Sequence, residues 1–204
     1  MGRAKLWTRT VQVGLVAVFV LGMTIRNVSV VLNALGALVV TLLPAILERD
    51  FSIELDPRFT VYLGIAVFLH AIGMFGFYDS VWWWDHMTHT LSATVIAVIG
   101  YTTVMAIDAH SDDLYFPPKF VTVFVLAFTL AMGVFWEVLE FAARELAIAF
   151  DLDPVLVLYG LSDTMWDLVF DLAGAVVVAL FGTGVIENQS EAVAAWLDRR
   201  RGTR

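Results

Sequence analysis

The chain has 204 residues, of which 60% are hydrophobic and 16% charged, with no cysteine and a formal net charge of -8. The mean hydropathy of +0.82 is far above that of a soluble domain and predicts a multi-pass protein of the cell membrane. The lack of cysteine excludes disulfides, thiolate metal sites and a cysteine nucleophile, and the acidic balance argues against nucleic acid as a partner.

Six apolar segments predict an all-α fold, a single domain over residues 1–186 that is a six-transmembrane-helix bundle. The segments lie near residues 6–25, 28–47, 59–78, 86–107, 119–146 and 164–186. Each approaches the roughly 20 residues that cross about 30 Å of hydrocarbon, and backbone groups in lipid must pair within a helix. No cleavage site follows the first segment, so we expect it to be retained as a helix. Pro44 near the end of the second segment is typical of a helix end.

The basic residues predict the orientation of the bundle. Ten of the 12 fall on the side that both termini share. They are Arg3, Lys5, Arg9, Arg49, Arg58, Lys119, Arg199, Arg200, Arg201 and Arg204. Because short loops rich in Lys and Arg stay in the cytoplasm, both termini are predicted to be cytoplasmic. Arg26 and Arg144 fall on the outer side.

The tail at residues 187–204 carries apolar side chains at helical spacing beside an arginine cluster. Val193, Trp196 and Leu197 form the apolar side. This pattern predicts a cytoplasmic basic amphipathic helix that lies on the membrane surface, with membrane lipids as its partner. The acid-rich loops and scarce lysine elsewhere favour a salt-adapted host such as a halophilic archaeon, because surface carboxylates hold hydration at high salt.

Polar residues open the fourth segment, in the stretch WWWDHMTHT. Asp85 and His89 are spaced i and i+4, so they share a helix face near the outer boundary of the membrane. His86 is interpreted as a boundary residue. His70, on the third segment, is predicted to reach a similar depth.

The fifth and sixth segments bring further acids to the same outer depth. Glu137 and Glu140 share one face of the fifth helix with Arg144, and an ion pair between Glu140 and Arg144 is the favoured interpretation. The sixth segment reads SDTMWDLVFDLAGA. Its three acids, Asp163, Asp167 and Asp171, cover an arc of about 80° that includes Gly174.

The cost of these acids predicts which way they face. An ionised carboxylate at the centre of a membrane helix costs about 2.5–3.5 kcal/mol, whereas each large apolar residue returns about 0.3–0.6 kcal/mol. Three lipid-facing Asp would therefore cancel the insertion energy of the sixth helix. They are predicted to face inward, with a proton, a cation or an arginine between them.

A divalent metal site is the favoured interpretation of the cluster. Its predicted ligands are Asp85, His89, Glu137, Glu140, Asp163, Asp167 and Asp171. Carboxylates with imidazole suit Mg, Mn, Ca, Fe or Zn, and helical bundles build such sites from facing helices. With Glu137 and Asp167 as catalytic residues, the site predicts a metal-dependent hydrolase or transferase that acts on a lipid-linked or envelope substrate. An ion or proton-coupled transporter and a purely structural cluster are the alternatives.

The same motifs resemble a known family. WDHMTHTLSA is similar to the D-x-x-x-H segment, FWEVLEF to the E-x-x-E segment, and SDTMWDLVFDLAGA to the D-x-x-W-D-x-x-x-D segment of the YjdF-like inner-membrane proteins, a domain of unknown function. The resemblance covers residues 55–186 and includes Trp166 with the seven predicted ligands. VanZ-like membrane proteins also open a helix with an acid and a histidine four residues on. These resemblances imply a polytopic bundle with a polar cluster.

Overall fold

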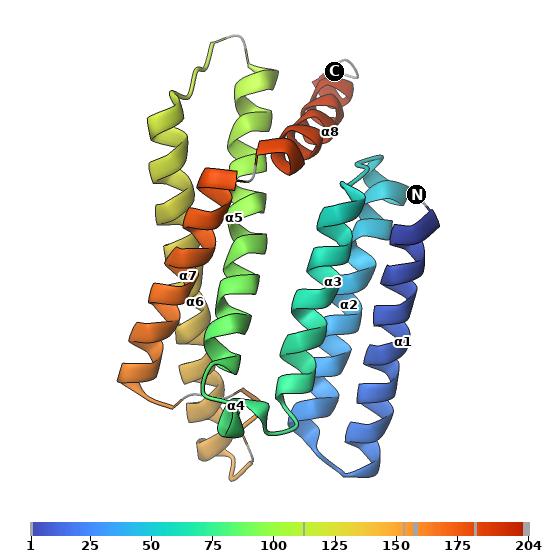
Figure 1. Cartoon of the computed structure of the whole chain (residues 1–204), viewed down its shortest axis with the longest axis vertical. Coiled ribbons are helices and arrows are strands. Elements are labelled where there is room, and N and C mark those ends of the chain that lie inside the picture. The colour runs from blue at the N-terminus through green and yellow to red at the C-terminus, as the bar shows by residue number, and fades with distance from the viewer. Residues whose placement is uncertain (1, 112, 153, 157–158, 182, 202–204) are drawn as a thin grey trace.

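In this computed structural model the chain is all-α (Figure 1). The structure describes residues 2–111, 113–152, 154–156, 159–181 and 183–201. Within these ranges it has eight helices. They are α1 (Gly2–Thr24), α2 (Val28–Phe51), α3 (Pro57–Gly73), α4 (Phe77–Ser80), α5 (Trp84–His110), α6 (Pro118–Ala149), α7 (Leu161–Phe181) and α8 (Thr183–Arg201).

Five of these helices are long and apolar enough to cross a membrane, which confirms the predicted multi-pass membrane protein. They are α1, α2, α5, α6 and α7. The sixth predicted span, near residues 59–78, is divided: α3 has 17 residues, and a turn separates it from the short α4. Gly76 makes this turn with φ 99°, a left-handed conformation that glycine adopts without strain.

The ends of α2 show how local sequence sets a helix and where the prediction was wrong. Asn27 caps the start, because its side chain accepts a hydrogen bond from Val30 N at 3.0 Å. The helix then continues through Pro44 to Phe51, beyond the predicted end near residue 47. Ser52, in the left-handed conformation, ends it there.

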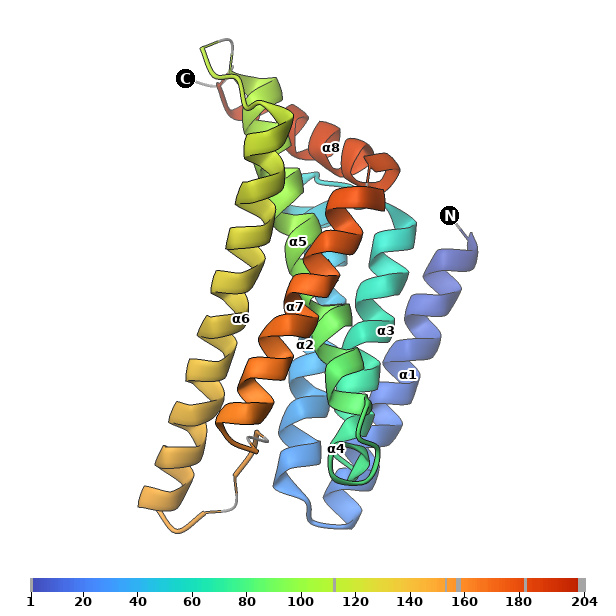
Figure 2. The ribbon, with the colours of Figure 1, turned by 60° about the vertical axis from the view of Figure 1, so that its left-hand side comes forward.

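The helices form two groups that meet along α3 and α5. In one group α1, α2 and α3 pack against one another, and in the other α5, α6 and α7 do the same. Figures 1 and 2 show α4 at the end of the bundle where the chain passes from the first group to the second. Helix α5 is central, since it contacts α3, α6, α7 and α8.

The last predicted span, near residues 164–186, is too long. Helix α7 ends at Phe181, and the C-terminal helix α8 already begins at Thr183. It lies at the end of the bundle where α1 begins (Figure 1). Asn188 donates to Asp56 Oδ2 at 3.0 Å, and Arg199 donates to Ser52 O at 2.9 Å, so α8 is held against the α2–α3 connection. The tail is therefore helical; Arg204 lies outside the described residues, and the cytoplasmic location of this end stays a prediction.

Candidate metal centre

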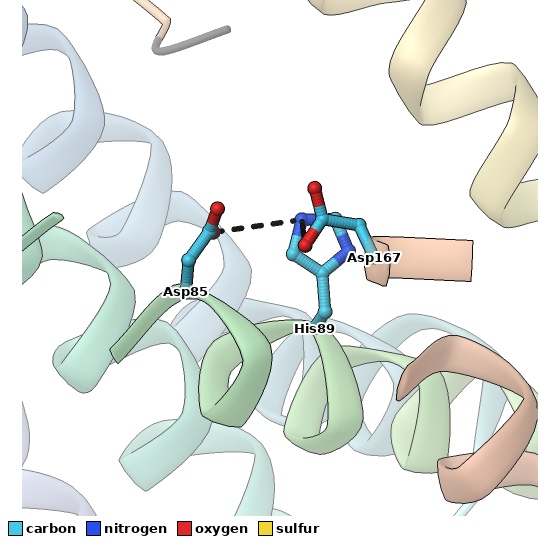
Figure 3. Close-up of side chains that lie close together, drawn as sticks. All are labelled: Asp85, His89 and Asp167. Atoms are coloured by element: carbon cyan, nitrogen blue, oxygen red, sulfur yellow. Dashed lines mark ion pairs between the residues drawn. The ribbon is translucent and has the colours of Figure 1, made fainter. Parts of the chain in front are cut away.

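Three polar side chains from two helices meet beside the start of α5. Asp85 and His89 belong to α5 and Asp167 to α7, and the three point toward one another (Figure 3). His89 Nε2 lies 3.7 Å from Asp85 Oδ1 and 4.0 Å from Asp167 Oδ1. The i and i+4 spacing on α5 thus presents an acid and an imidazole to one acid of α7.

The spacing of the three groups fits a bound cation. One ligand atom from each residue lies within 4.8 Å of the other two. Ligands at about 2.0–2.6 Å from one ion lie at most about 4–5 Å apart. Asp85, His89 and Asp167 can therefore share an ion with only small side-chain movements.

Asp171 sits behind His89 and orients its ring. His89 Nδ1 lies 3.2 Å from Asp171 Oδ1. An ionised carboxylate only accepts hydrogen bonds, so an ionised Asp171 would place the proton of a neutral His89 ring on Nδ1. The lone pair would then be on Nε2, the nitrogen that faces Asp85 and Asp167. Metal-binding histidines are commonly held this way by a carboxylate. The structure thus places Asp171, predicted as a ligand, against the His89 nitrogen that faces away from Asp85 and Asp167.

Several carboxylate oxygens here are buried and make no hydrogen bond. They are Glu137 Oε1, Asp167 Oδ1 and Asp171 Oδ2, and their residues are 7%, 2% and 4% exposed. Leaving a buried acceptor unpaired costs about 1–3 kcal/mol, and more for a charged group. A cation or a bound proton would remove this cost. The unpaired oxygen of Asp167 is the one that faces the nitrogens of His86 and His89.

His86, interpreted from the sequence as a boundary residue, lies against the site. Its Nδ1 is 3.5 Å from Asp167 Oδ1, without hydrogen-bond alignment. Its ring stacks on Phe170 with centroids 4.5 Å apart and planes at 7°. The stack fixes His86 beside Asp167, which the spacing from Asp85 alone did not indicate.

The other predicted ligands have separate partners. Glu137 Oε2 accepts from the Thr164 hydroxyl at 2.8 Å, and Glu140 Oε1 accepts from the Trp136 indole at 2.9 Å. Asp163 Oδ2 accepts from a backbone N–H at 3.3 Å. Among the described residues, the three-ligand group contains only Asp85, His89 and Asp167.

Two glycines bring the site helices close enough to build this arrangement. A Cβ added to Gly174 of α7 would lie 2.6 Å from the backbone oxygen of Thr90, so only glycine lets α7 approach α5 here. A Cβ added to Gly133 of α6 would lie 2.1 Å from Asp171 Oδ2. Gly133 therefore provides the space that the Asp171 carboxylate occupies while it holds His89.

A second polar network faces the site from the other helix group. His70 Nε2 lies 3.1 Å from Asn33 Oδ1, and His70 Nδ1 lies 2.7 Å from the Tyr78 hydroxyl. That hydroxyl is also 3.3 Å from Thr88 Oγ1 on α5. Burial raises the pKa of Tyr78, so it stays protonated and can donate to His70. Of this network, the sequence analysis identified only His70. Asn33, a polar residue within an apolar segment, is the sequence feature that indicates the rest.

A cavity of about 620 Å³ separates the network from the cluster. Its walls come from α2, α3, α5, α6 and α7 together with the α3–α4 turn and α4. Asp85, His89, Glu140 and Asp171 line it on one side, and Asn33, His70 and Tyr78 line it on the other. The volume is within the range of about 300–1,000 Å³ that is usual for small-molecule sites.

Comparisons with known proteins support a membrane role and no particular reaction. Residues 7–188 match a family described as "Predicted membrane protein (DUF2238)". An "Uncharacterized protein" of Thermotoga maritima is 30% identical over 138 residues, which are 67% of each chain. No solved structure matches the chain. The resemblances to YjdF-like and VanZ-like proteins and the salt-adapted host stay predictions.

Proposed function

Because the chain belongs to the DUF2238 family of predicted membrane proteins, we propose that its polar cluster is a divalent metal site within the membrane. Asp85, His89 and Asp167 supply the ligands. Two observations carry this proposal together. One ligand atom from each of the three residues lies within 4.8 Å of the other two, and Oδ1 of Asp167 is buried without a hydrogen bond. His89 is prepared for the role, because Asp171 holds the proton on the opposite nitrogen.

The ligand set favours a site that does chemistry. Catalytic metal sites typically have three protein ligands and leave a position for water or substrate. Two carboxylates and one imidazole suit Mg, Mn, Fe, Ca or Zn. Such an ion would polarise a phosphate or ester and activate water. We therefore propose a hydrolase or transferase that acts on a lipid-linked or envelope substrate.

Glu137 is the proposed proton acceptor. One of its oxygens is held by Thr164, and the other is buried without a hydrogen-bond partner. A carboxylate oriented through one oxygen keeps the second available to take a proton from a nucleophile. Asp167 takes part in the reaction as a ligand. Glu140 and Asp163, which bond to other groups, belong to the surroundings of the site.

A structural role for the cluster is the competing reading, and one observation favours it. His89 lies within 4.0 Å of Asp85, Asp167 and Asp171, so a protonated ring would join α5 to α7 through three carboxylates. In that case the cluster would stabilise the bundle and bind no cation. Metal analysis separates the two readings.

The test is the metal content of protein purified without chelators and then loaded with each candidate ion. We expect about one divalent ion per chain in the wild type. Asp167→Asn should retain none, since it removes a charged ligand. Asp79→Asn is the matched control, because Asp79 is exposed and lies at the same end of the bundle, where it accepts from Tyr159.

Equal metal content in Asp167→Asn and Asp79→Asn, or none in the wild type after loading, would contradict the proposal. A structural cluster predicts a different result, in which Asp167→Asn lowers the melting temperature while every variant lacks metal. Hydrolysis of phosphate and carboxylic esters by the loaded protein, compared between wild type and Glu137→Gln, then tests the reaction.

A further inference from the structure

The cavity beside the cluster is long in the direction of the helices. On α5 its wall extends from Asp85 to Ile96, and on α6 from Thr129 to Glu140. Eleven residues of helix rise about 16 Å. The hydrocarbon core of a bilayer is about 30 Å thick, so the cavity is about as long as one leaflet is deep.

The two ends of the cavity differ in chemistry. Asp85 and His89 line one end, together with Glu140 of α6. Along α5, Ser92 and Ala93 lead to Val95 and Ile96 at the far end. The α2 and α3 walls change in the same direction, from Asn33 and His70 to the apolar side chains of Val40 and Leu63. The cavity therefore has one polar end and a mostly apolar remainder, in which Thr129 is a polar side chain at the far end.

The cavity is open on the side between α2 and α6. Leu32 of α2 and Phe135 and Leu139 of α6 line it and are also 45%, 53% and 41% exposed. Both helices are long and apolar enough to cross the membrane, so this opening faces the hydrocarbon of the bilayer. A hydrocarbon chain can enter from the side without crossing water.

The geometry points to a lipid-binding site in which one hydrocarbon chain of a membrane lipid fills the cavity and the headgroup lies at Asp85 and His89. The position of the headgroup rests on the proposed function, whereas the binding of the chain does not depend on a metal. A protein or a soluble small molecule fits less well, because the opening faces lipid and the walls beyond the polar end are mostly apolar. The substrate class of the cluster is then a lipid with an ester or phosphate near its headgroup.

Gly36 allows the chain site to be blocked without disturbing the protein. It lines the cavity on α2, and a Cβ placed on it meets no atom within 4 Å. Gly36→Phe would put a ring into the open space. Leu35→Phe is the matched control, since Leu35 is the next residue, is 47% exposed and does not line the cavity.

The experiment uses the full chain in vesicles of phosphatidylethanolamine and phosphatidylglycerol that contain phosphatidylglycerol with a diazirine at the end of one acyl chain. After illumination, labelled peptides are identified by mass spectrometry. We expect labelling of cavity residues such as Leu63 and Ile96, lower by about tenfold in Gly36→Phe and unchanged in Leu35→Phe. A melting temperature equal to that of the wild type shows that Gly36→Phe is folded.

The outcomes separate the two proposals. Labelling that is spread over exposed residues, or that is equal in Gly36→Phe and Leu35→Phe, overturns the chain site even if the protein retains metal. Labelling at Leu63 and Ile96 that persists in Asp167→Asn supports the chain site, whether or not the wild type binds an ion. If Gly36→Phe unfolds, Gly36→Leu replaces it with the same expected direction.

Discussion

The two helix groups differ in the burial of their most enclosed span and in the acids that they carry. In the α5 span 44% of the apolar window is buried, against 17% in α1, 22% in both α2 and α6, and 28% in α7. The acids of the cluster lie on the α5–α7 side, and the inner face of α7 carries Asp167 and Asp171 while Val169 and Val177 face outward. A charged side chain is tolerated only where neighbouring helices shield it from lipid. The comparison teaches that the central position of α5 is what permits a polar site.

The largest effect should come from Gly133→Ala, in the group that carries the site. The new methyl group would lie 2.1 Å from Asp171 Oδ2 and would therefore displace the Asp171 carboxylate from His89. Loss of such an orienting carboxylate typically costs about 10–100-fold in metal affinity, which a metal titration would measure. Gly64→Ala in α3 is the control, since its methyl group would meet Val11 at an ordinary 3.5 Å. Equal affinity in both variants would mean that Asp171 does not orient His89.

A smaller effect, on the free energy of unfolding, is expected when glycine is replaced by alanine at one position in each group. Gly174→Ala should lower the free energy of unfolding by about 1–3 kcal/mol, because its methyl group overlaps the backbone of Thr90. Gly36→Ala should raise it by up to about 1 kcal/mol, because alanine favours the helix and the site is open. Thermal unfolding in detergent measures both. A free energy of unfolding that Gly174→Ala does not lower would show that the α5–α7 approach is not tight, and one that Gly36→Ala lowers would show that the site at Gly36 is not open.

The smallest effect lies at the opposite end of the bundle from the cluster. Asp56 precedes α3, and hydrogen bonds from Arg58 lower its pKa to about 2 against the cost of burial, with help from Asn188. A lowered pKa stabilises the folded state above the unfolded value of about 3.9, and this contribution is lost as the pH falls through about 2.

Asp56→Asn keeps the helix cap and removes the charge, so the stability difference from wild type should shrink between pH 5 and pH 2. We expect the difference at neutral pH to be below about 1 kcal/mol, because the Arg58 side chain is 68% exposed and solvent screens its charge. Asp56→Ala also removes the cap and should cost about 1 kcal/mol more. A difference that does not change with pH would show that the pair with Arg58 contributes nothing.

Periodicity predicted the helices well and their interruptions poorly. The break between α3 and α4 depends on Gly76 and on Tyr78, which turns inward to reach His70 and Thr88. These contacts join residues of different helices, so no local pattern within residues 59–78 indicates them. Pro44 likewise remains within α2, since one proline does not end a helix that its neighbours hold.

The sequence by itself determined that the chain is a helical membrane protein. It also determined that Asp85 shares a helix face with His89, and Asp167 with Asp171. Both follow from the sequence because hydropathy and a period of 3.6 residues are local properties. Only the tertiary structure decided which groups meet. In the folded chain Asp167 lies near His89 Nε2 and Asp171 lies near His89 Nδ1, and Glu137 accepts a hydrogen bond from Thr164. Those pairings depend on which helices are neighbours and how each is rotated about its axis, and both are set by close contacts such as those at Gly133 and Gly174.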